Sequence, residues 1–202
     1  MYKRQDHYSQ RVKIVLAEKD ISAEINEAKP DETPDEILSI SPYHKLPILV
    51  DRDLAIHDPS VMMEYLDERF PHPPLLPIYP NEKAECRLLI HRIERDWLPI
   101  MDKMMVPKIT QREFDKLKKE LVSLVAGIVL VLKEKPYFMS DDFSFVDCYM
   151  SAILYRLPYL GVSTPKSKSF DSLYSYQDKL FARPGFELSL TDSERDLKYS
   201  FN

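Results

Sequence analysis

Two cysteines and five histidines are the side chains of this 202-residue sequence best suited to metal binding or nucleophilic chemistry. Cys86 and Cys148 lie far apart and form no pair with metal-ligand spacing. No H-E-x-x-H or G-x-S-x-G segment occurs, and the 3 glycines are too scattered to form a phosphate-binding loop. The sequence therefore predicts no metal, no cofactor and no catalytic motif.

His72 differs from the other histidines because Pro71, Pro73 and Pro74 surround it. Prolines fix the backbone and lack an N–H, so they would hold the imidazole outward at a low entropic cost. Such an arrangement favours binding to a partner over catalysis, and the alternative is a rigid spacer between two domains. The remaining histidines have no predicted partner for nucleophilic catalysis: His7, His44, His57 and His91.

The charge balance limits the classes of partner. The chain carries 28 basic and 33 acidic residues, a formal net charge of −5. Because affinity for a phosphate backbone comes mainly from lysine and arginine, binding to nucleic acid or an anionic membrane by the chain alone is disfavoured. No apolar run approaches the roughly 18 residues of a transmembrane helix, and no signal-peptide pattern opens the chain. We therefore expect a cytoplasmic protein in a reducing compartment.

Residues 1–70 are predicted to form a small α/β domain whose first strand is missing or cut short. A helix is expected first, with an apolar face that excludes Lys13 and Glu18. The next elements alternate between strand and helix patterns. In chain order, the predicted elements are a helix over 8–19, a strand over 21–28, a weak helix over 31–39, strands over 46–50 and 54–56, and a helix over 59–70.

Asp58 and Pro59 have the right chemistry to begin that last helix. An aspartate side chain can accept from the free N–H groups of the first turn, and a proline at the first helical position sacrifices no intrahelical hydrogen bond. The apolar stripe expected on this helix consists of Val61, Met62, Tyr65, Leu66 and Phe70.

A proline-rich connector, residues 71–80, separates the two predicted domains, because its prolines exclude both a helix and a central strand. Residues 81–202 are predicted to be all-helical. The expected helices cover 81–104, 110–134, 144–157 and 173–182, and Pro184 with Gly185 is expected to end the last of them.

The start of the helix at residue 144 carries a specific local signal. Ser144 and Asp147 have the spacing of a capping box, in which each side chain accepts a hydrogen bond from the backbone N–H of the other residue. Phe143 and Cys148 occupy the positions of a hydrophobic staple. We predict that this segment serves folding and has no catalytic role.

Three segments carry a resemblance to a known family: V-K-I-V-L-A-E-K over 12–19, M-E-Y-L-D-E-R-F-P-H-P-P-L over 63–75 and F-S-F-V-D-C-Y over 143–149. Together they resemble the stringent starvation protein A family, the RNA polymerase-associated members of the glutathione transferase superfamily. The resemblance extends over roughly residues 8–190. It implies an α/β plus all-α fold, with a thioredoxin-like N-terminal domain and a helical C-terminal domain.

Glutathione chemistry can be tested at the positions that match this superfamily. Asp6 stands where a serine or cysteine is usual, and its carboxylate would repel a thiolate. Pro59 replaces a serine after the acid Asp58, which removes a hydroxyl and an N–H that would bind the glutamyl carboxylate. Leu46 and Pro47 match the family's cis-proline turn, which the fold itself requires. We predict a vestigial glutathione site, with Tyr8 and Ser9 as the residual candidates for a catalytic hydroxyl.

The resemblance implies a non-enzymatic regulator that binds RNA polymerase holoenzyme, including its sigma factor, and alters promoter choice during starvation or acid stress. A homodimer is expected, with DNA contacted only through the polymerase. Glu64, Asp67 and Glu68 could add to the contact. The alternative is a glutathione-dependent transferase or reductase. The surface implied for the partner is Phe70, Pro71, His72, Pro73, Pro74 and Leu75, with Tyr79 as a neighbour.

Overall fold

The computed structural model describes residues 2–3, 6–28, 35–43, 45–106, 108–192 and 194–195. The chain divides into two compact units, one formed by Met1–Leu75 with Arg183–Asn202 and the other by Leu76–Ala182. The division falls inside the predicted connector, residues 71–80. The second unit ends at Ala182, whereas the predicted helical domain ran to residue 202, because the helix that follows Ala182 packs on the first helix of the chain.

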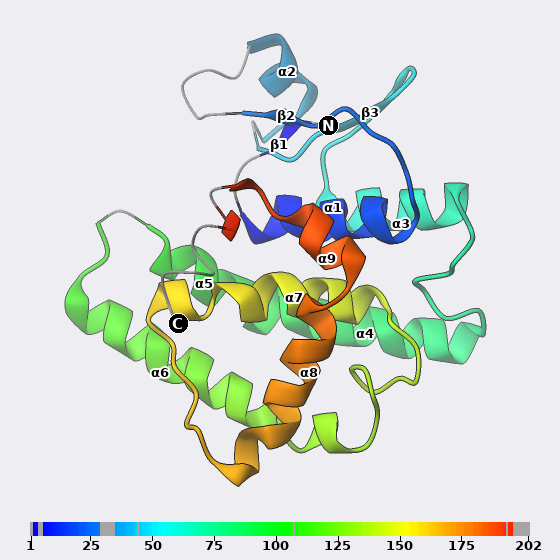
Figure 1. Cartoon of the computed structure of the whole chain (residues 1–202). Coiled ribbons are helices and arrows are strands. Elements are labelled where there is room, and N and C mark those ends of the chain that lie inside the picture. Colours follow the sequence, from blue (N-terminus) through cyan, green and yellow to red (C-terminus); the bar gives the residue numbers. More distant parts are fainter. Residues whose placement is uncertain are drawn as a thin grey trace. The chain divides into compact units, whose positions relative to one another are not determined.

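The first unit contains two short pairs of strands (Figure 1). β1 (Tyr2–Lys3) runs parallel to β2 (Asn26–Glu27), and β3 (Leu49–Asp51) runs antiparallel to β4 (Leu54–Ile56). The first strand is therefore present but only two residues long. The predicted strand over 21–28 is wrong for its first part, because residues 22–25 are exposed and Asn26–Glu27 alone pairs.

The helices of this unit are α1 (His7–Glu18), α2 (Asp35–Ile40), α3 (Pro59–Arg69) and α9 (Pro184–Ser189). The predicted weak helix over 31–39 is described only from Asp35, since residues 31–34 lie outside the described residues. In α3, Met62 and Leu66 are buried as predicted, whereas Val61 and Phe70 are exposed. Pro184 was predicted to end a helix, and it also begins α9 as that helix's first residue.

α1 packs against both α3 and α9, which explains why polar residues are buried on it. Lys13 was predicted to lie outside the buried face, yet it is buried because its Nζ donates to the Ser189 carbonyl at the end of α9. The Glu18 carboxylate is also largely covered, and Arg183 donates to it through Nε at 2.8 Å and Nη2 at 2.5 Å. A side chain at Gly185 would overlap Glu18.

The second unit is helical, with α7 as its most buried helix (Figure 1). Its main helices are α4 (Pro80–Asp96), α5 (Leu98–Met104), α6 (Gln111–Ile128), α7 (Phe145–Arg156) and α8 (Asp171–Phe181). Short 3-10 turns cover 131–133, 158–160 and 168–170.

Two predicted helices of this unit are shorter than expected. The helix over 81–104 is broken at Trp97, because Pro99 cannot donate an intrahelical hydrogen bond and instead lies in the first turn of a new helix that begins at Leu98. The predicted helix over 110–134 begins at Gln111, with Thr110 as its cap, and ends at Ile128. All residues of α7 are buried, so this helix forms the centre of the unit's core.

The capping box at the start of α7 is confirmed. The Ser144 N–H and Oγ–H donate to Asp147 Oδ2 at 2.8 and 3.0 Å, and the Tyr176 hydroxyl and the Phe138 N–H donate to Oδ1 at 2.6 and 3.0 Å. Burial raises the pKa of the Asp147 carboxyl, and these hydrogen bonds oppose the shift. Burial, with the nearby Asp147 charge, raises the pKa of Tyr176 well above its usual value.

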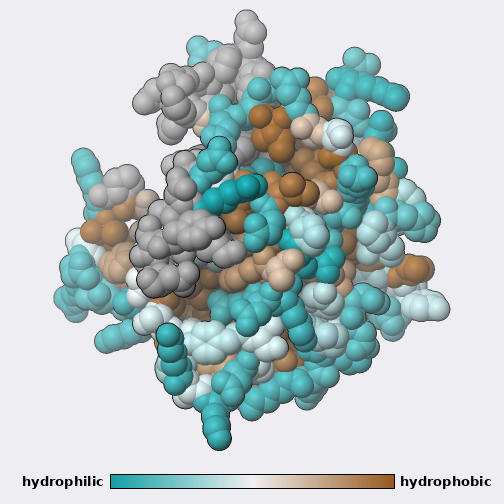
Figure 2. Space-filling model, viewed as in Figure 1, coloured by the Kyte–Doolittle hydropathy of each residue, from teal (hydrophilic) through white to brown (hydrophobic). Residues whose placement is uncertain are grey.

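Charged and polar side chains cover most of the helical part of the face shown in Figure 2. No helix among the described residues is both long and apolar enough to cross a membrane. Within the same residues, no group of three or more histidine, cysteine, aspartate and glutamate side chains is placed to hold a metal ion.

Candidate partner-binding site

The proline loop, residues 70–75, is exposed along most of its length. The Phe70 side chain is 38% exposed, and residues 71–74 are all exposed. Leu75 differs, because only 3% of it is exposed. The prediction that Leu75 belongs to the partner-binding surface is therefore corrected: this residue anchors the end of the loop in the core of the first unit, and the surface consists of residues 70–74.

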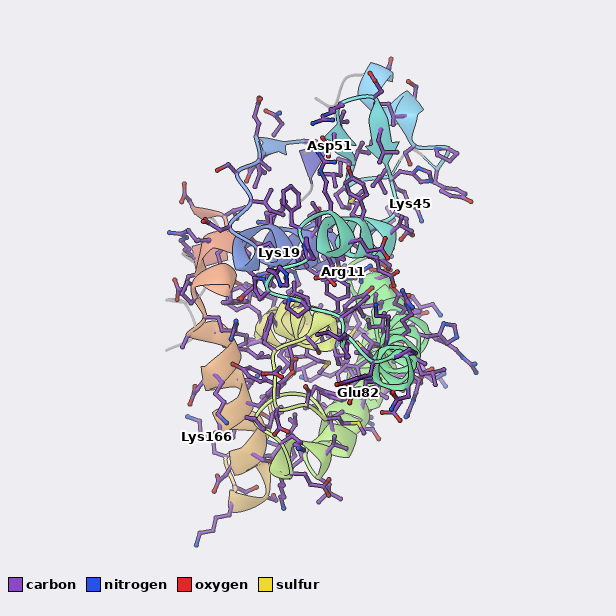
Figure 3. All side chains as sticks on the ribbon, turned by 90° about the vertical axis from the view of Figure 1, so that its right-hand side faces the viewer. Arg11, Lys19, Lys45, Asp51, Glu82 and Lys166 are labelled. Carbon is purple, nitrogen blue, oxygen red and sulfur yellow. The ribbon has the colours of Figure 1, made fainter. Side chains whose placement is uncertain are left out.

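Lys19, which ends α1, holds this loop from the inside (Figure 3). Its side chain is fully buried. The ammonium donates to the Phe70 carbonyl at 2.6 Å and to the Pro73 carbonyl at 2.7 Å. It also forms an ion pair with Asp67 Oδ1 at 2.7 Å. One buried cation therefore fixes both ends of the exposed segment between Phe70 and Pro73.

Asp67 completes the anchor from α3. Its Oδ1 accepts from the Leu75 N–H at 2.9 Å, so the carboxylate bonds both to Lys19 and to the end of the loop. Asp67 is buried, and the expectation that it contacts a partner is wrong for this reason. Glu68, the next residue, is exposed and available for contact.

Arg69 flanks the loop and covers one side of its aromatic residue. The guanidinium carbon lies 5.6 Å from the centre of the Phe70 ring, within the range of a cation–π contact. Arg69 Nε pairs with Asp51 at 2.9 Å, and the Tyr65 hydroxyl donates to the same carboxylate at 2.7 Å. That hydrogen bond to Asp51 is the main cause of the raised pKa of Tyr65.

The two acids at glutathione-site positions act as helix caps. Asp6 begins α1 and accepts from the Ser9 N–H at 2.7 Å. Asp58 begins α3, where Oδ1 accepts from the N–H groups of Ser60 and Val61 at 2.9 and 3.0 Å. Pro59 is the first residue of α3, as predicted. Capping of this kind stabilises each helix by about 1 kcal/mol.

The other positions that match the superfamily's glutathione site lie in the first unit as well. The Leu46–Pro47 peptide bond is cis, and Pro47 is buried. Ser9 is fully buried, which removes its hydroxyl from contact with a ligand in solution. Tyr8 is half-buried, and the Arg11 guanidinium lies 5.0 Å from the centre of its ring.

The remaining candidates lie on other elements of the two units. Tyr79 belongs to the second unit, where it precedes α4 and is largely exposed. His7 is buried at the start of α1, and His91 is exposed on α4. His44 lies outside the described residues. Lys19 and Arg69 were not predicted as parts of this site. Lys19 ends the segment over 12–19 that carried the family resemblance, and Arg69 lies in the segment over 63–75, directly before the loop.

Comparison with known proteins identifies the family. Residues 2–74 match the family Glutathione S-transferase, N-terminal domain, and residues 91–184 match Glutathione S-transferase, C-terminal domain. A stringent starvation protein A homolog of Coxiella burnetii is 45% identical over 195 residues, which cover 96% of this chain and 91% of that protein. This chain belongs to the stringent starvation protein A family. A homolog of Pasteurella multocida is 41% identical, with 92% of this chain and 86% of the relative covered.

Glutathione transferases are more distant relatives of this family member. Glutathione S-transferase 3 of Glycine max is 30% identical over 142 residues, covering 69% of this chain and 64% of that protein. The solved structure of a sphingomonad glutathione S-transferase complexed with glutathione has a TM-score of 0.84 at 17% identity, covering 96% and 99% of the two chains. The predicted fold class, a thioredoxin-like domain joined to a helical domain, is confirmed. Likeness at this identity shows the fold alone.

Proposed function

We propose that this protein is a non-enzymatic, cytoplasmic regulator that binds RNA polymerase holoenzyme through protein–protein contact and alters transcription during starvation or acid stress. The observation that carries the proposal is the proline loop. A buried ion pair, Lys19–Asp67, bonds to backbone groups of Phe70, Pro73 and Leu75. Residues 71–74 remain exposed. A surface that is ordered before binding loses little entropy when a partner docks.

The chemistry of the exposed residues supports a protein partner. Pro71, Pro73 and Pro74 have no N–H to offer, so the loop presents apolar rings around one imidazole, that of His72. Such a surface suits side-chain contacts with another protein. The net charge of −5 also suits a partner that presents basic residues, as the DNA-facing parts of a sigma factor do. In this proposal the protein acts as a homodimer and meets DNA only through the polymerase.

Binding of the purified protein to sigma-containing holoenzyme and to core polymerase, each at physiological salt, tests the proposal. We expect micromolar or tighter binding to the holoenzyme and weaker binding to the core. Absence of binding to the holoenzyme would contradict the proposal and would direct attention to the alternative, a glutathione-dependent transferase or reductase.

Glutathione is expected to leave the melting temperature unchanged to within about 1 °C. A ligand present at about 100 times its Kd would stabilise the folded state by about 2.7 kcal/mol, which corresponds to a shift of several degrees. We expect no such shift because Asp6 and Asp58 cap helices and Pro59 lacks the donors that a glutamyl carboxylate needs. Differential scanning calorimetry with and without millimolar glutathione checks this. A clear rise, together with retention on immobilised glutathione, would support the alternative function.

A further inference from the structure

We propose that Lys19 is a positioning residue for partner recognition: its buried ammonium sets the shape of the proline loop and thereby the affinity for the partner. The identity of the partner rests on the proposed function. The effect of Lys19 on the shape of the loop does not depend on that function. Lys19 itself has no exposed side-chain surface, so it acts only through the loop.

The proline loop cannot fix its own shape through backbone hydrogen bonds. Pro71, Pro73 and Pro74 have no N–H, and the Phe70 N–H is used by the end of α3, where it donates to the Leu66 carbonyl. The Leu75 N–H donates to Asp67. A loop with so few donors needs donors from elsewhere to hold its carbonyls.

The Lys19 ammonium supplies those donors. It has three N–H groups and three acceptors within hydrogen-bond distance: the carbonyls of Phe70 and Pro73 and Oδ1 of Asp67. Two carbonyls three residues apart are therefore held at one nitrogen. The chain between them, Pro71 and His72, must bow outward, which is where the structure exposes both residues.

Charge makes this contact stronger than a neutral one. Hydrogen bonds from an ammonium are roughly twice as strong as those between neutral groups, and burial removes the competition from water. The exposed residues determine what the partner contacts, and Lys19 determines where those residues stand.

The test removes the cation without leaving a buried charge behind. Lys19→Met alone would remove the ammonium that pairs with the buried Asp67 carboxylate, so it is combined with Asp67→Asn, which keeps an oxygen for the Leu75 N–H. Lys13→Met combined with Glu194→Gln is the matched control, because Lys13 is a buried lysine of α1 that bonds to the Ser189 carbonyl and pairs with Glu194 at 3.8 Å, and neither partner belongs to the loop. Circular dichroism with urea unfolding checks that each variant is folded.

Two readouts separate positioning from general stability. In the double variant, the NMR signals of the His72 ring should move toward those of an unstructured peptide, and holoenzyme affinity should fall roughly tenfold or more. The control variant with Lys13→Met and Glu194→Gln should lose stability but keep both the His72 signals and the affinity. Unchanged His72 signals in the double variant, or altered signals with unchanged affinity, would overturn the proposal. If the wild-type protein binds no holoenzyme, the proposed function fails, and the His72 signals still decide what Lys19 does.

Discussion

Replacing Asp147 by alanine is expected to lower the free energy of unfolding by about 3 kcal/mol or more. The carboxylate is fully buried and accepts from the Ser144 backbone and hydroxyl, the Phe138 N–H and the Tyr176 hydroxyl. Alanine leaves these four donors with no acceptor from residue 147, and each buried donor left without an acceptor costs about 1–3 kcal/mol. Urea unfolding followed by circular dichroism measures the effect, since the affected unit is helical.

Asp142→Ala is the matched control, because Asp142 is exposed and lies just before the same helix. It should change the stability by no more than about 0.5 kcal/mol. A loss below about 1 kcal/mol for Asp147→Ala would contradict the expected contribution of the Asp147 hydrogen bonds to stability. Such a result would mean that removing the free-energy cost of burying the carboxylate offsets the loss of its hydrogen bonds.

The cost of Asp147→Ala should also depend on pH. Burial raises the folded-state pKa of this carboxyl above its ordinary value of 3.8, so the folded state holds the proton more tightly than the unfolded state. The contribution of Asp147 to stability is therefore full at acid pH and declines as pH rises through the raised pKa. Since alanine does not titrate, the measured cost should be larger near about pH 4 than near about pH 7.

Phe186→Ala is expected to cost about 3–5 kcal/mol of unfolding free energy. Phe186 is 1% exposed on α9, the short helix that packs on α1. Truncating a buried aromatic ring removes its burial from water and leaves a cavity. A helix of six residues gains little from its own hydrogen bonds, so this side chain carries much of its attachment.

Leu188→Ala provides the control within the same helix. Leu188 is 68% exposed, so its truncation should change the stability by no more than about 0.5 kcal/mol. Equal losses for the two variants in urea unfolding would contradict the packing of α9 described above. A lower free energy of unfolding in Phe186→Ala but not in Leu188→Ala would show that residues after Ala182 stabilise the first unit.

The features that could be predicted from sequence are those fixed by neighbours in the chain. Asp58 with Pro59 predicted the start of α3, and Ser144 with Asp147 predicted the cap of α7, because a cap depends on residues two or three positions away. The exposure of residues 71–74 followed from proline chemistry for the same reason.

Contacts between distant segments explain what the sequence analysis missed. Lys13 and Glu18 were placed on the solvent side of α1, because nothing near them indicates that a helix 165 residues further along covers Glu18. Lys19 and Asp67 are one ion pair in the structure, but a lysine and an aspartate 48 positions apart have no pairing signature in a single sequence. Leu75 was assigned to the surface because its neighbours are exposed, whereas its backbone bond to Asp67 turns it inward.

In the proposed function, the protein recognises RNA polymerase through the proline loop. The most direct measurement compares the holoenzyme affinity of the wild-type protein with that of a variant in which Pro71, His72, Pro73 and Pro74 are all alanine. A control variant replaces four exposed residues of α6 by alanine: Lys116, Lys119, Glu120 and Ser123.

We predict that the loop variant stays folded and loses holoenzyme binding by roughly 30-fold or more, equivalent to about 2 kcal/mol. The α6 control should bind as the wild-type protein does. Unchanged affinity in a folded loop variant would contradict recognition through the proline loop, because the partner would then contact another surface of the protein.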